Sequence, residues 1–141
     1  MHISASCRCG EVRFESKEDP VIQLCCHCTD CRDVLTIESK ALDYATIAFF
    51  KKSTVQLTGE VEERIYTAAS GNKTVREYCP CCDIVMFDKS EGFPTLVGVF
   101  AQHIDPPFQI KPACHVWIKD KLSHVYIPEG VTQHEKGIPQ R

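Results

Sequence analysis

The sequence lacks the features that mark membrane, nucleic-acid-binding and secreted proteins. Its longest apolar runs, such as Thr95 to Ala101, are far shorter than the roughly 20 residues that an α-helix needs to cross a bilayer. Lysine and arginine number 16 against 19 aspartate and glutamate, and the formal net charge of −3 offers no basic surface to nucleic acid. The first residues, MHISAS, contain neither the basic nor the apolar segment of a secretory signal. We therefore expect a cytoplasmic protein that binds neither membranes nor nucleic acid.

Repeats, low-complexity stretches and linkers rich in proline, glycine or serine are also missing. A chain of 141 residues without such breaks is long enough to bury roughly two thirds of its unfolded surface around one core. The segment after Pro128 is polar and rich in turn-forming residues, so we expect irregular chain that lies over the surface. The sequence predicts one domain, residues 1–125, with residues 126–141 as a C-terminal tail packed on or near it.

What the chain has in abundance is cysteine, with ten residues of this type. They form three clusters and one isolated position: Cys7 and Cys9; Cys25, Cys26, Cys28 and Cys31; Cys79, Cys81 and Cys82; and Cys114 alone. Disulfides are difficult to maintain in a reducing compartment, and close clustering favours metal ligation over disulfide pairing. The composition therefore predicts zinc sites, with buried cysteines that bind no metal as the alternative.

Most of the chain has the pattern of β-strands. Residues 11–15 alternate between charged and apolar side chains, which is the period of two expected of a half-buried strand. β-Branched and aromatic residues predict further strands at 21–24, 45–50, 54–58, 61–67, 74–78, 84–87, 95–100 and 115–118. Ser70-Gly71-Asn72 should join 61–67 to 74–78 in a hairpin. Only residues 32–42 suit a short helix, so the predicted fold class is mainly β.

The first and last cysteine clusters predict one metal site. If the backbone is extended there, Cys7 and Cys9 project from one face of a strand, and both thiolates reach the same ion. Cys79 and Cys82, in C-x2-C spacing, supply the other half of a tetrahedral zinc site, with Cys79 and Cys81 as the alternative pair. Four thiolates close the coordination shell, which is typical of a structural zinc.

Each half of this site is followed by a residue suited to a turn. Gly10 lets the backbone turn away after Cys9. Asp83 can adopt the left-handed conformation that a cysteine knuckle often needs, although less readily than glycine. Both positions therefore favour a turn directly after the cysteine pair.

The central cluster predicts a second site of a different kind. If residues 24–28 are extended, Cys26 and Cys28 point to one face, and Cys31 returns to them after a tight turn at Thr29-Asp30. Three sulfurs then converge. A zinc with three protein ligands keeps a fourth position for water or substrate, which is typical of a catalytic centre. A thiol bound there is deprotonated by coordination, so Cys26, Cys28 and Cys31 are the candidate catalytic residues, through bound zinc.

Three neighbours of this second site have alternative roles. Cys25 points to the opposite face and is interpreted as a small core residue instead of a ligand. His27 could be a fourth ligand, a proton shuttle, a hydrogen-bond partner behind a ligand, or an exposed residue. Arg32 follows the last ligand and is a candidate for holding an anionic group of the substrate, with a surface ion pair as the alternative.

Four residues nearer the C-terminus are also candidate site residues. His115 either closes the zinc shell or lies on a strand face, and Trp117 is a core residue or a platform for a ligand. His103 and Asp105 lie in a loop just before two prolines, and we expect this loop at the rim of a pocket. None of these four residues carries a specific signal by itself.

Three ordered motifs resemble those of the glutathione-dependent formaldehyde-activating enzyme family, the GFA domain, which also includes centromere protein V. The motifs are Cys7-Arg8-Cys9-Gly10, then Cys26-His27-Cys28-Thr29-Asp30-Cys31-Arg32, then Tyr78-Cys79-Pro80-Cys81-Cys82. The resemblance extends more loosely to residues 55–59 and 112–117, and covers roughly residues 5–120.

The resemblance implies two zinc ions per chain. One is a structural zinc on Cys7, Cys9, Cys79 and Cys82, and the other is a catalytic-type zinc on Cys26, Cys28 and Cys31. It also implies a β-tent fold, in which small antiparallel sheets lean together around the metals. The implied activity is that of a carbon–sulfur lyase, which condenses glutathione with formaldehyde to S-hydroxymethylglutathione while zinc holds the sulfur.

Two other functions are compatible with the same residues. In the first, both metals are structural and the protein is a zinc-stabilised module that binds a protein partner. The fourth ligand of the second metal distinguishes this module from an enzyme that binds a small thiol such as glutathione. In the second, the spare cysteines Cys25, Cys81 and Cys114 sense redox state, which requires exposed thiols of low pKa.

Overall fold

The computed structural model describes residues 2–34, 36–37, 40–41 and 43–138. The strands are β1 (Ile3–Ser6), β2 (Arg13–Ser16), β3 (Ile22–Cys26), β4 (Thr36–Ile37), β5 (Lys40–Ala41), β6 (Ala45–Lys51), β7 (Val55–Thr58), β8 (Glu62–Thr67), β9 (Lys73–Tyr78), β10 (Val85–Ser90), β11 (Leu96–Phe100), β12 (Cys114–Val116) and β13 (Thr132–Gln133). The helices are α1 (Thr29–Val34) and the 3₁₀ turns η1 (Lys52–Thr54), η2 (Ala101–His103) and η3 (Ile118–Asp120). The predicted class, a mainly β single domain, is confirmed. None of the helices among the described residues has the length and apolarity to cross a bilayer.

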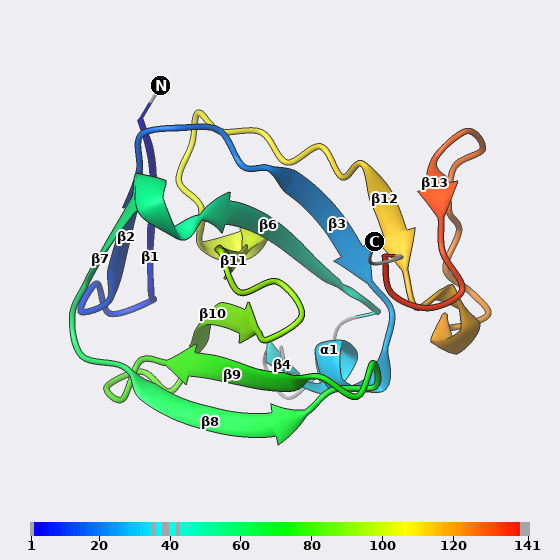
Figure 1. The fold of residues 1–141 in the computed structure, drawn as a ribbon, viewed down its shortest axis with the longest axis horizontal. Coiled ribbons are helices and arrows are strands. Elements are labelled where there is room, and N and C mark those ends of the chain that lie inside the picture. Colours follow the sequence, from blue (N-terminus) through cyan, green and yellow to red (C-terminus); the bar gives the residue numbers. More distant parts are fainter. Residues whose placement is uncertain (1, 35, 38–39, 42, 139–141) are drawn as a thin grey trace.

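Two sheets and a small hairpin make up the architecture (Figure 1). One sheet has three strands in the order β1-β2-β7, and the other has eight in the order β13-β12-β3-β6-β11-β10-β9-β8. Pairing is antiparallel from β3 to β8, but β12 runs parallel to both β3 and β13. The large sheet is therefore antiparallel, as expected, except at the edge formed by β12 and β13. β4 and β5 pair with each other in a separate hairpin.

Local patterns account for the two hairpins that carry the outer cysteines. In β2 and just before it, Val12 and Phe14 are buried while Arg13 and Glu15 are exposed, so the period of two reflects one face packed on the core. β8 pairs with β9 from Glu62↔Tyr78 to Thr67↔Lys73, and Gly71 turns the chain with a φ of +89°. The predicted 61–67/74–78 hairpin is confirmed.

The helix begins earlier than the sequence predicts. The N–H of Arg32 donates to the carbonyl of Cys28 at 3.0 Å, and the N–H of Cys31 donates to the Cys28 Sγ at 3.4 Å. Cys28 thus acts as the N-cap, a role that serine or aspartate usually fills, and the supposed tight turn at Thr29-Asp30 is the first helical turn. Beyond Val34 the chain forms β4 and β5, so the helix expected over 32–42 is confirmed only for 32–34 and is wrong for the strands that follow; positions 35, 38–39 and 42 lie outside the described residues.

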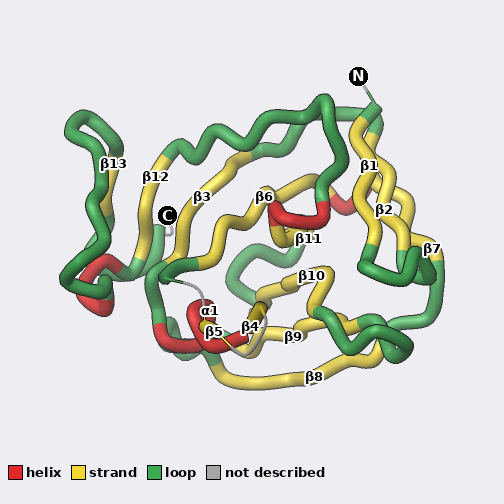
Figure 2. The backbone as a smooth tube through the Cα atoms, turned by 180° about the vertical axis from the view of Figure 1, so that it is seen from behind, coloured by secondary structure: helices red, strands yellow, loops and turns green. Residues whose placement is uncertain are grey.

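The end of the chain also differs from expectation. β12 ends at Val116, because Trp117 takes a left-handed backbone conformation with a φ of 57°, and a 3₁₀ turn follows. The tail is not irregular throughout, since Thr132 and Gln133 add to the sheet beside Cys114 and His115. Figures 1 and 2 show β13 next to β12 from opposite sides of the molecule. A two-residue strand carries no periodicity that a sequence could reveal.

Two clusters of buried residues form the core. Between the two sheets, Phe14 packs on Phe50 and Phe87 with ring centroids 4.9 and 6.2 Å apart. Burial of each such ring contributes about 1.5–3 kcal/mol. The second cluster contains the three cysteines of the central motif together with Ile47 and Phe100. The central sulfurs are therefore part of the core of the large sheet.

Candidate metal centres

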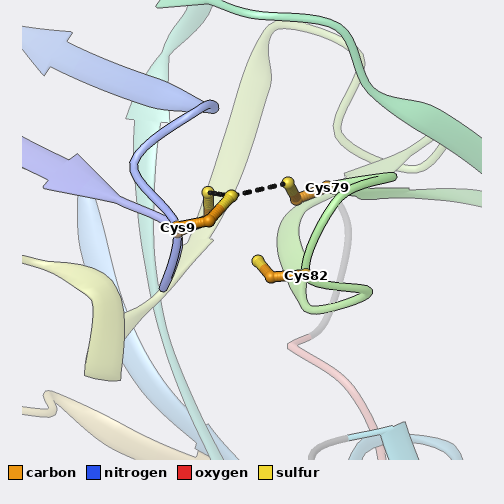
Figure 3. Close-up of side chains that lie close together, drawn as sticks. Cys9, Cys79 and Cys82 are labelled. Atoms are coloured by element: carbon orange, nitrogen blue, oxygen red, sulfur yellow. Dashed lines mark hydrogen bonds between the residues drawn. The ribbon is translucent and has the colours of Figure 1, made fainter.

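A four-sulfur centre joins two turns that are far apart in sequence. Cys7 and Cys9 lie between β1 and β2, and Cys79 and Cys82 lie between β9 and β10. The four Sγ atoms all lie within 4.8 Å of one another, and Cys9 is 3.5 Å from both Cys7 and Cys79. Four sulfurs around a tetrahedral zinc would be about 3.8 Å apart. Figure 3 shows Cys9 on one turn facing Cys79 and Cys82 on the other, so this donor set fits a closed zinc site.

The Cys7–Cys9 half is a turn, where the sequence predicts an extended strand. β1 ends at Ser6, and the N–H of Gly10 donates to the Cys7 carbonyl at 3.1 Å, with a Gly10 φ of +81°. The N–H of Val12 then donates to the Cys7 Sγ at 3.3 Å. The sulfurs converge because this left-handed turn folds the backbone around them.

The Cys79–Cys82 half has the same design. Asp83 takes a left-handed φ of 53°, as the sequence predicts, and its N–H donates to the Cys79 carbonyl at 2.8 Å. Cys82 is the residue that this turn brings to the cluster, whereas Cys81 is exposed and lies outside it. The structure therefore brings together the preferred pair, Cys79 and Cys82.

Electrostatics at this centre favour a thiolate. Burial raises the pKa of Cys7, but the N–H of Val12 and the neighbouring sulfurs outweigh burial and lower the pKa to about 6. Thiolates are the form that binds zinc. The lowered pKa of Cys7 therefore suits metal binding at this centre.

A three-sulfur centre lies at the junction of β3 and α1. Cys26 ends β3, Cys28 caps the helix and Cys31 lies in its first turn. All three are buried, their Sγ atoms lie within 4.8 Å of one another, and those of Cys26 and Cys28 are 3.3 Å apart. Among the described residues, no histidine, cysteine, aspartate or glutamate adds a fourth ligand atom to this group.

The three sulfurs differ in their affinity for protons. The neighbouring sulfurs of Cys26 and Cys31 hold the pKa of Cys28 at about 3, helped by the N–H of Cys31 and opposed by burial. The same contacts raise the pKa of Cys26 and of Cys31. Contacts among the three sulfurs therefore favour a thiolate at Cys28, and a divalent cation would take the place of the thiol protons around it.

Arg76 of β9 is a residue of this centre that the sequence analysis did not identify. Its side chain is 5% exposed, and its Nη2 donates to the Cys31 Sγ at 3.5 Å. Its Nη1 donates to the Asp30 carbonyl at 3.1 Å, and its Nε donates to Asp88 Oδ2 at 3.0 Å. The available signal was an arginine in the middle of a predicted strand, where a charged side chain on the inner face needs a partner.

Arg32, the candidate for binding an anion, has a different position. Its Nε donates to the His27 carbonyl at 3.1 Å and its Nη2 to Thr29 Oγ1 at 3.3 Å. These bonds hold the loop between β3 and α1. Arg32 does not line the cavity described below, whereas Arg76 does.

His27 and His115 form a buried pair beside the three-sulfur centre. The Nε2 of His27 lies 2.8 Å from the Nδ1 of His115, and the ring of Tyr44 packs 5.0 Å from that of His27. Burial, with His115 acting in the same direction, lowers the pKa of His27 to about 4, so both rings are neutral at pH 7. Neither imidazole joins the sulfur cluster, and the interpretation of His27 as exposed is wrong.

The spare cysteines and the predicted loop residues lie elsewhere. Burial raises the pKa of Cys25 and of Cys114, the opposite of what a redox sensor needs, and only Cys81 is exposed. His103 is buried with its Nε2 2.8 Å from the Val85 carbonyl. Asp105 accepts a hydrogen bond from Ser4 and lines a separate pocket.

A cavity of about 580 Å³ opens onto the three sulfurs. Seven strands of the large sheet line it, namely β3, β6, β8, β9, β10, β11 and β12. Its walls include Ile47, Phe49 and Trp117, with Arg76 and Asp88 as a buried charged pair. The three-sulfur centre is thus accessible from a ligand-sized space, whose volume is within the ~300–1,000 Å³ of small-molecule sites.

Comparison with known proteins agrees with this geometry. A crystal structure of a protein from Rhodobacter sphaeroides has a similar fold, with a TM-score of 0.51 and 18% identity over 93% of this chain and 98% of that one. No curated protein sequence matches the chain. The family model for "Glutathione-dependent formaldehyde-activating enzyme" matches residues 2–120, which include both cysteine centres. The chain therefore belongs to the glutathione-dependent formaldehyde-activating enzyme family.

Proposed function

We propose that the chain is a zinc-dependent carbon–sulfur lyase that acts on a glutathione-type thiol adduct, as an S-hydroxymethylglutathione synthase does. The observation that carries the proposal is the contrast between the two sulfur centres. One has four sulfurs and is complete, and the other has three sulfurs and borders the cavity. Thiolate donors in these numbers are typical of structural and catalytic zinc, respectively.

The two centres would have separate tasks. Cys7, Cys9, Cys79 and Cys82 would hold a structural zinc that ties the β1–β2 turn to the β9–β10 turn. Cys26, Cys28 and Cys31 would hold a second zinc, which when bound supplies a cationic site where a thiol loses its proton and becomes a nucleophile. In the condensation a C–S bond forms while the C=O double bond of formaldehyde becomes a single bond, and the thiol proton ends on that oxygen; the lyase direction reverses these changes.

The chain's own residues would prepare that site in two ways. Arg76 places a fixed positive charge beside Cys31 and offsets part of the negative charge of three thiolates. Ile47, Phe49 and Trp117 exclude water from one side of the cavity, which strengthens electrostatic interactions at the sulfurs. Neither His27 nor His115 lines the cavity, so the contact between their rings links the residue after β3 to β12 and does not reach a ligand.

A protein-binding module with two structural metals is the alternative function. It requires a fourth protein ligand at the three-sulfur centre. The described residues supply none, and the open side faces the cavity. This arrangement favours the enzyme.

Metal content and thiol binding test the proposal together. The chain should bind two metal ions, and cobalt in place of zinc should give a spectrum that changes when glutathione is added. Cys28→Ser should lose one metal and the glutathione response, whereas Cys81→Ser should keep both. Two bound cobalt ions with no response to glutathione would refute the lyase and support the module.

A further inference from the structure

The C-terminal segment 132–138 forms one wall of the cavity. β13 pairs with β12, and the hydrogen bonds continue beyond it: the N–H of His134 donates to the His115 carbonyl at 2.9 Å, and the N–H of Trp117 donates to the Lys136 carbonyl at 3.0 Å. Lys136, Gly137 and Ile138 line the cavity. Figure 2 shows this part of the chain beside β12, at the end of the molecule opposite β1, β2 and β7.

This wall is packed and lies outside the part of the chain that the family model matches, residues 2–120. Ile138 contacts the core cluster that contains the three sulfurs. Gly137 lies against the Trp117 indole, where a Cβ on Gly137 would be 3.6 Å from Nε1. Ligand selection can therefore depend on residues beyond the part of the chain that the family model matches.

Two lysines give this side of the cavity a positive charge, Lys136 in the wall itself and Lys119 in the 3₁₀ turn η3. Lys119 and Lys136 both line the cavity, next to Trp117. The Nζ of Lys119 has one carboxylate nearby, Asp120 Oδ1 at 3.8 Å, in a half-exposed pair that contributes little. Lys136 forms no ion pair with any carboxylate of the described residues.

The remaining charges of the cavity wall compensate each other. Asp88 is the one carboxylate residue among its described lining residues, and it is paired with Arg76 at 3.0 Å. The lysine charges are thus left for a ligand. A small thiol whose sulfur lies at the cysteine cluster would place its other groups along this wall.

We propose that Lys119 and Lys136 select ligands that carry a carboxylate away from the sulfur, while Trp117 and Ile138 pack against the ligand's backbone. The inference rests on the proposed function, because it names the substrate class of the same site. It makes the C-terminal segment a specificity element of this chain.

Trp117 provides a readout that needs neither metal nor activity. It is the single tryptophan of the chain, so its fluorescence reports on the cavity. The probes are S-methylglutathione, which has carboxylates at both ends and no free thiol, and its diethyl ester. We expect S-methylglutathione to change the fluorescence saturably and to bind more tightly than the ester, with a preference that weakens as salt is raised.

The lysine variants test the assignment directly. Lys119→Met and Lys136→Met should each weaken S-methylglutathione binding about two- to fivefold, and the double variant about five- to tenfold, with ester binding unchanged. Lys17→Met, at an exposed lysine beyond β2 that does not line the cavity, should bind as the wild type does. If the double variant does not fold, the affinities of the two single variants are compared with that of the wild type.

Three results would overturn the inference: no fluorescence change with S-methylglutathione, equal affinity for acid and ester, or full affinity in the lysine variants. The cobalt experiment separates this failure from that of the lyase. A glutathione response at cobalt without lysine dependence leaves the lyase intact and removes the selection by Lys119 and Lys136. If binding of S-methylglutathione depends on the lysines but cobalt does not respond to glutathione, the selection by Lys119 and Lys136 stands and the lyase is refuted.

Discussion

Arg76 donates a hydrogen bond to the sulfur of Cys31 across 3.5 Å. The two residues are 45 positions apart, and the guanidinium is fixed from its other sides by the Asp30 carbonyl and the Asp88 carboxylate. A cation held in this way stabilises the thiolate form of its neighbour. The three-sulfur centre is therefore adapted to carry negative charge, as a metal-binding cluster must be.

Replacing Arg76 should shift metal binding at the three-sulfur centre to higher pH. Without the guanidinium the thiols hold their protons more firmly, so Arg76→Met should raise the pH midpoint of cobalt binding there by about 1–2 units. The measurement is the thiolate–cobalt absorption as a function of pH. Lys52→Met removes an exposed charge that does not line the cavity and serves as the control. An unchanged midpoint in Arg76→Met would contradict this role.

The same substitution should destabilise the fold, because Asp88 would remain buried without its partner. We expect a loss of about 3–5 kcal/mol in the unfolding free energy of Arg76→Met. In the double variant Arg76→Met/Asp88→Leu much of this loss should be recovered, since no buried charge is left, while the shifted cobalt midpoint should persist. Urea unfolding of the metal-loaded proteins measures the stability. A double variant no more stable than Arg76→Met would show that the unpaired carboxylate is not the cause.

The four-sulfur centre should carry much of the stability of the domain. Cys79→Ser should lose one metal ion and a large part of the ~5–15 kcal/mol expected of a domain, because this centre joins two turns about seventy residues apart. Cys81→Ser should change the unfolding free energy by no more than about 0.5 kcal/mol, since Cys81 is exposed and outside the cluster. Metal analysis and thermal unfolding compare the two variants. Equal losses in both would refute the assignment of Cys79 and Cys82 as the ligand pair.

The His27–His115 pair should make the fold sensitive to acid. The pKa of His27 is about 4 in the folded protein against an ordinary 6.5, so the unfolded chain binds more protons between these values and stability falls as pH decreases through this window. We expect a loss of about 1–2 kcal/mol between pH 7 and pH 5 that His27→Phe removes. Because acid also releases metal, the measured quantity is the difference between variant and wild type in urea unfolding. His2→Phe, at an exposed histidine, should retain the wild-type loss.

Much of the fold follows from local sequence patterns. The alternation around Phe14 and the Ser70-Gly71-Asn72 turn predict their strands and hairpin because the determinants lie within a few residues. The cysteine spacing predicts which sulfurs converge because this determinant is also local: a turn of fixed length positions the two sulfurs on either side of it. The left-handed Asp83 follows from the same turn chemistry.

What the sequence analysis missed depends on contacts between distant segments. Arg76 is buried because Asp88 and Cys31 surround it in the folded chain, and its place in a predicted strand indicates a need for a partner but not which residues supply it. Cys28 caps a helix through its sulfur, a use that capping preferences do not anticipate. Thr132 and Gln133 become a strand only because the edge of β12 offers them backbone partners.

Zinc X-ray absorption of the chain with both metals bound can distinguish one complete and one incomplete sulfur centre from two complete ones. We expect an average sulfur coordination between three and four per zinc, with an oxygen or nitrogen contribution, that rises to four when glutathione is added. An average of four sulfurs without any added thiol, or one that glutathione leaves unchanged, would contradict it.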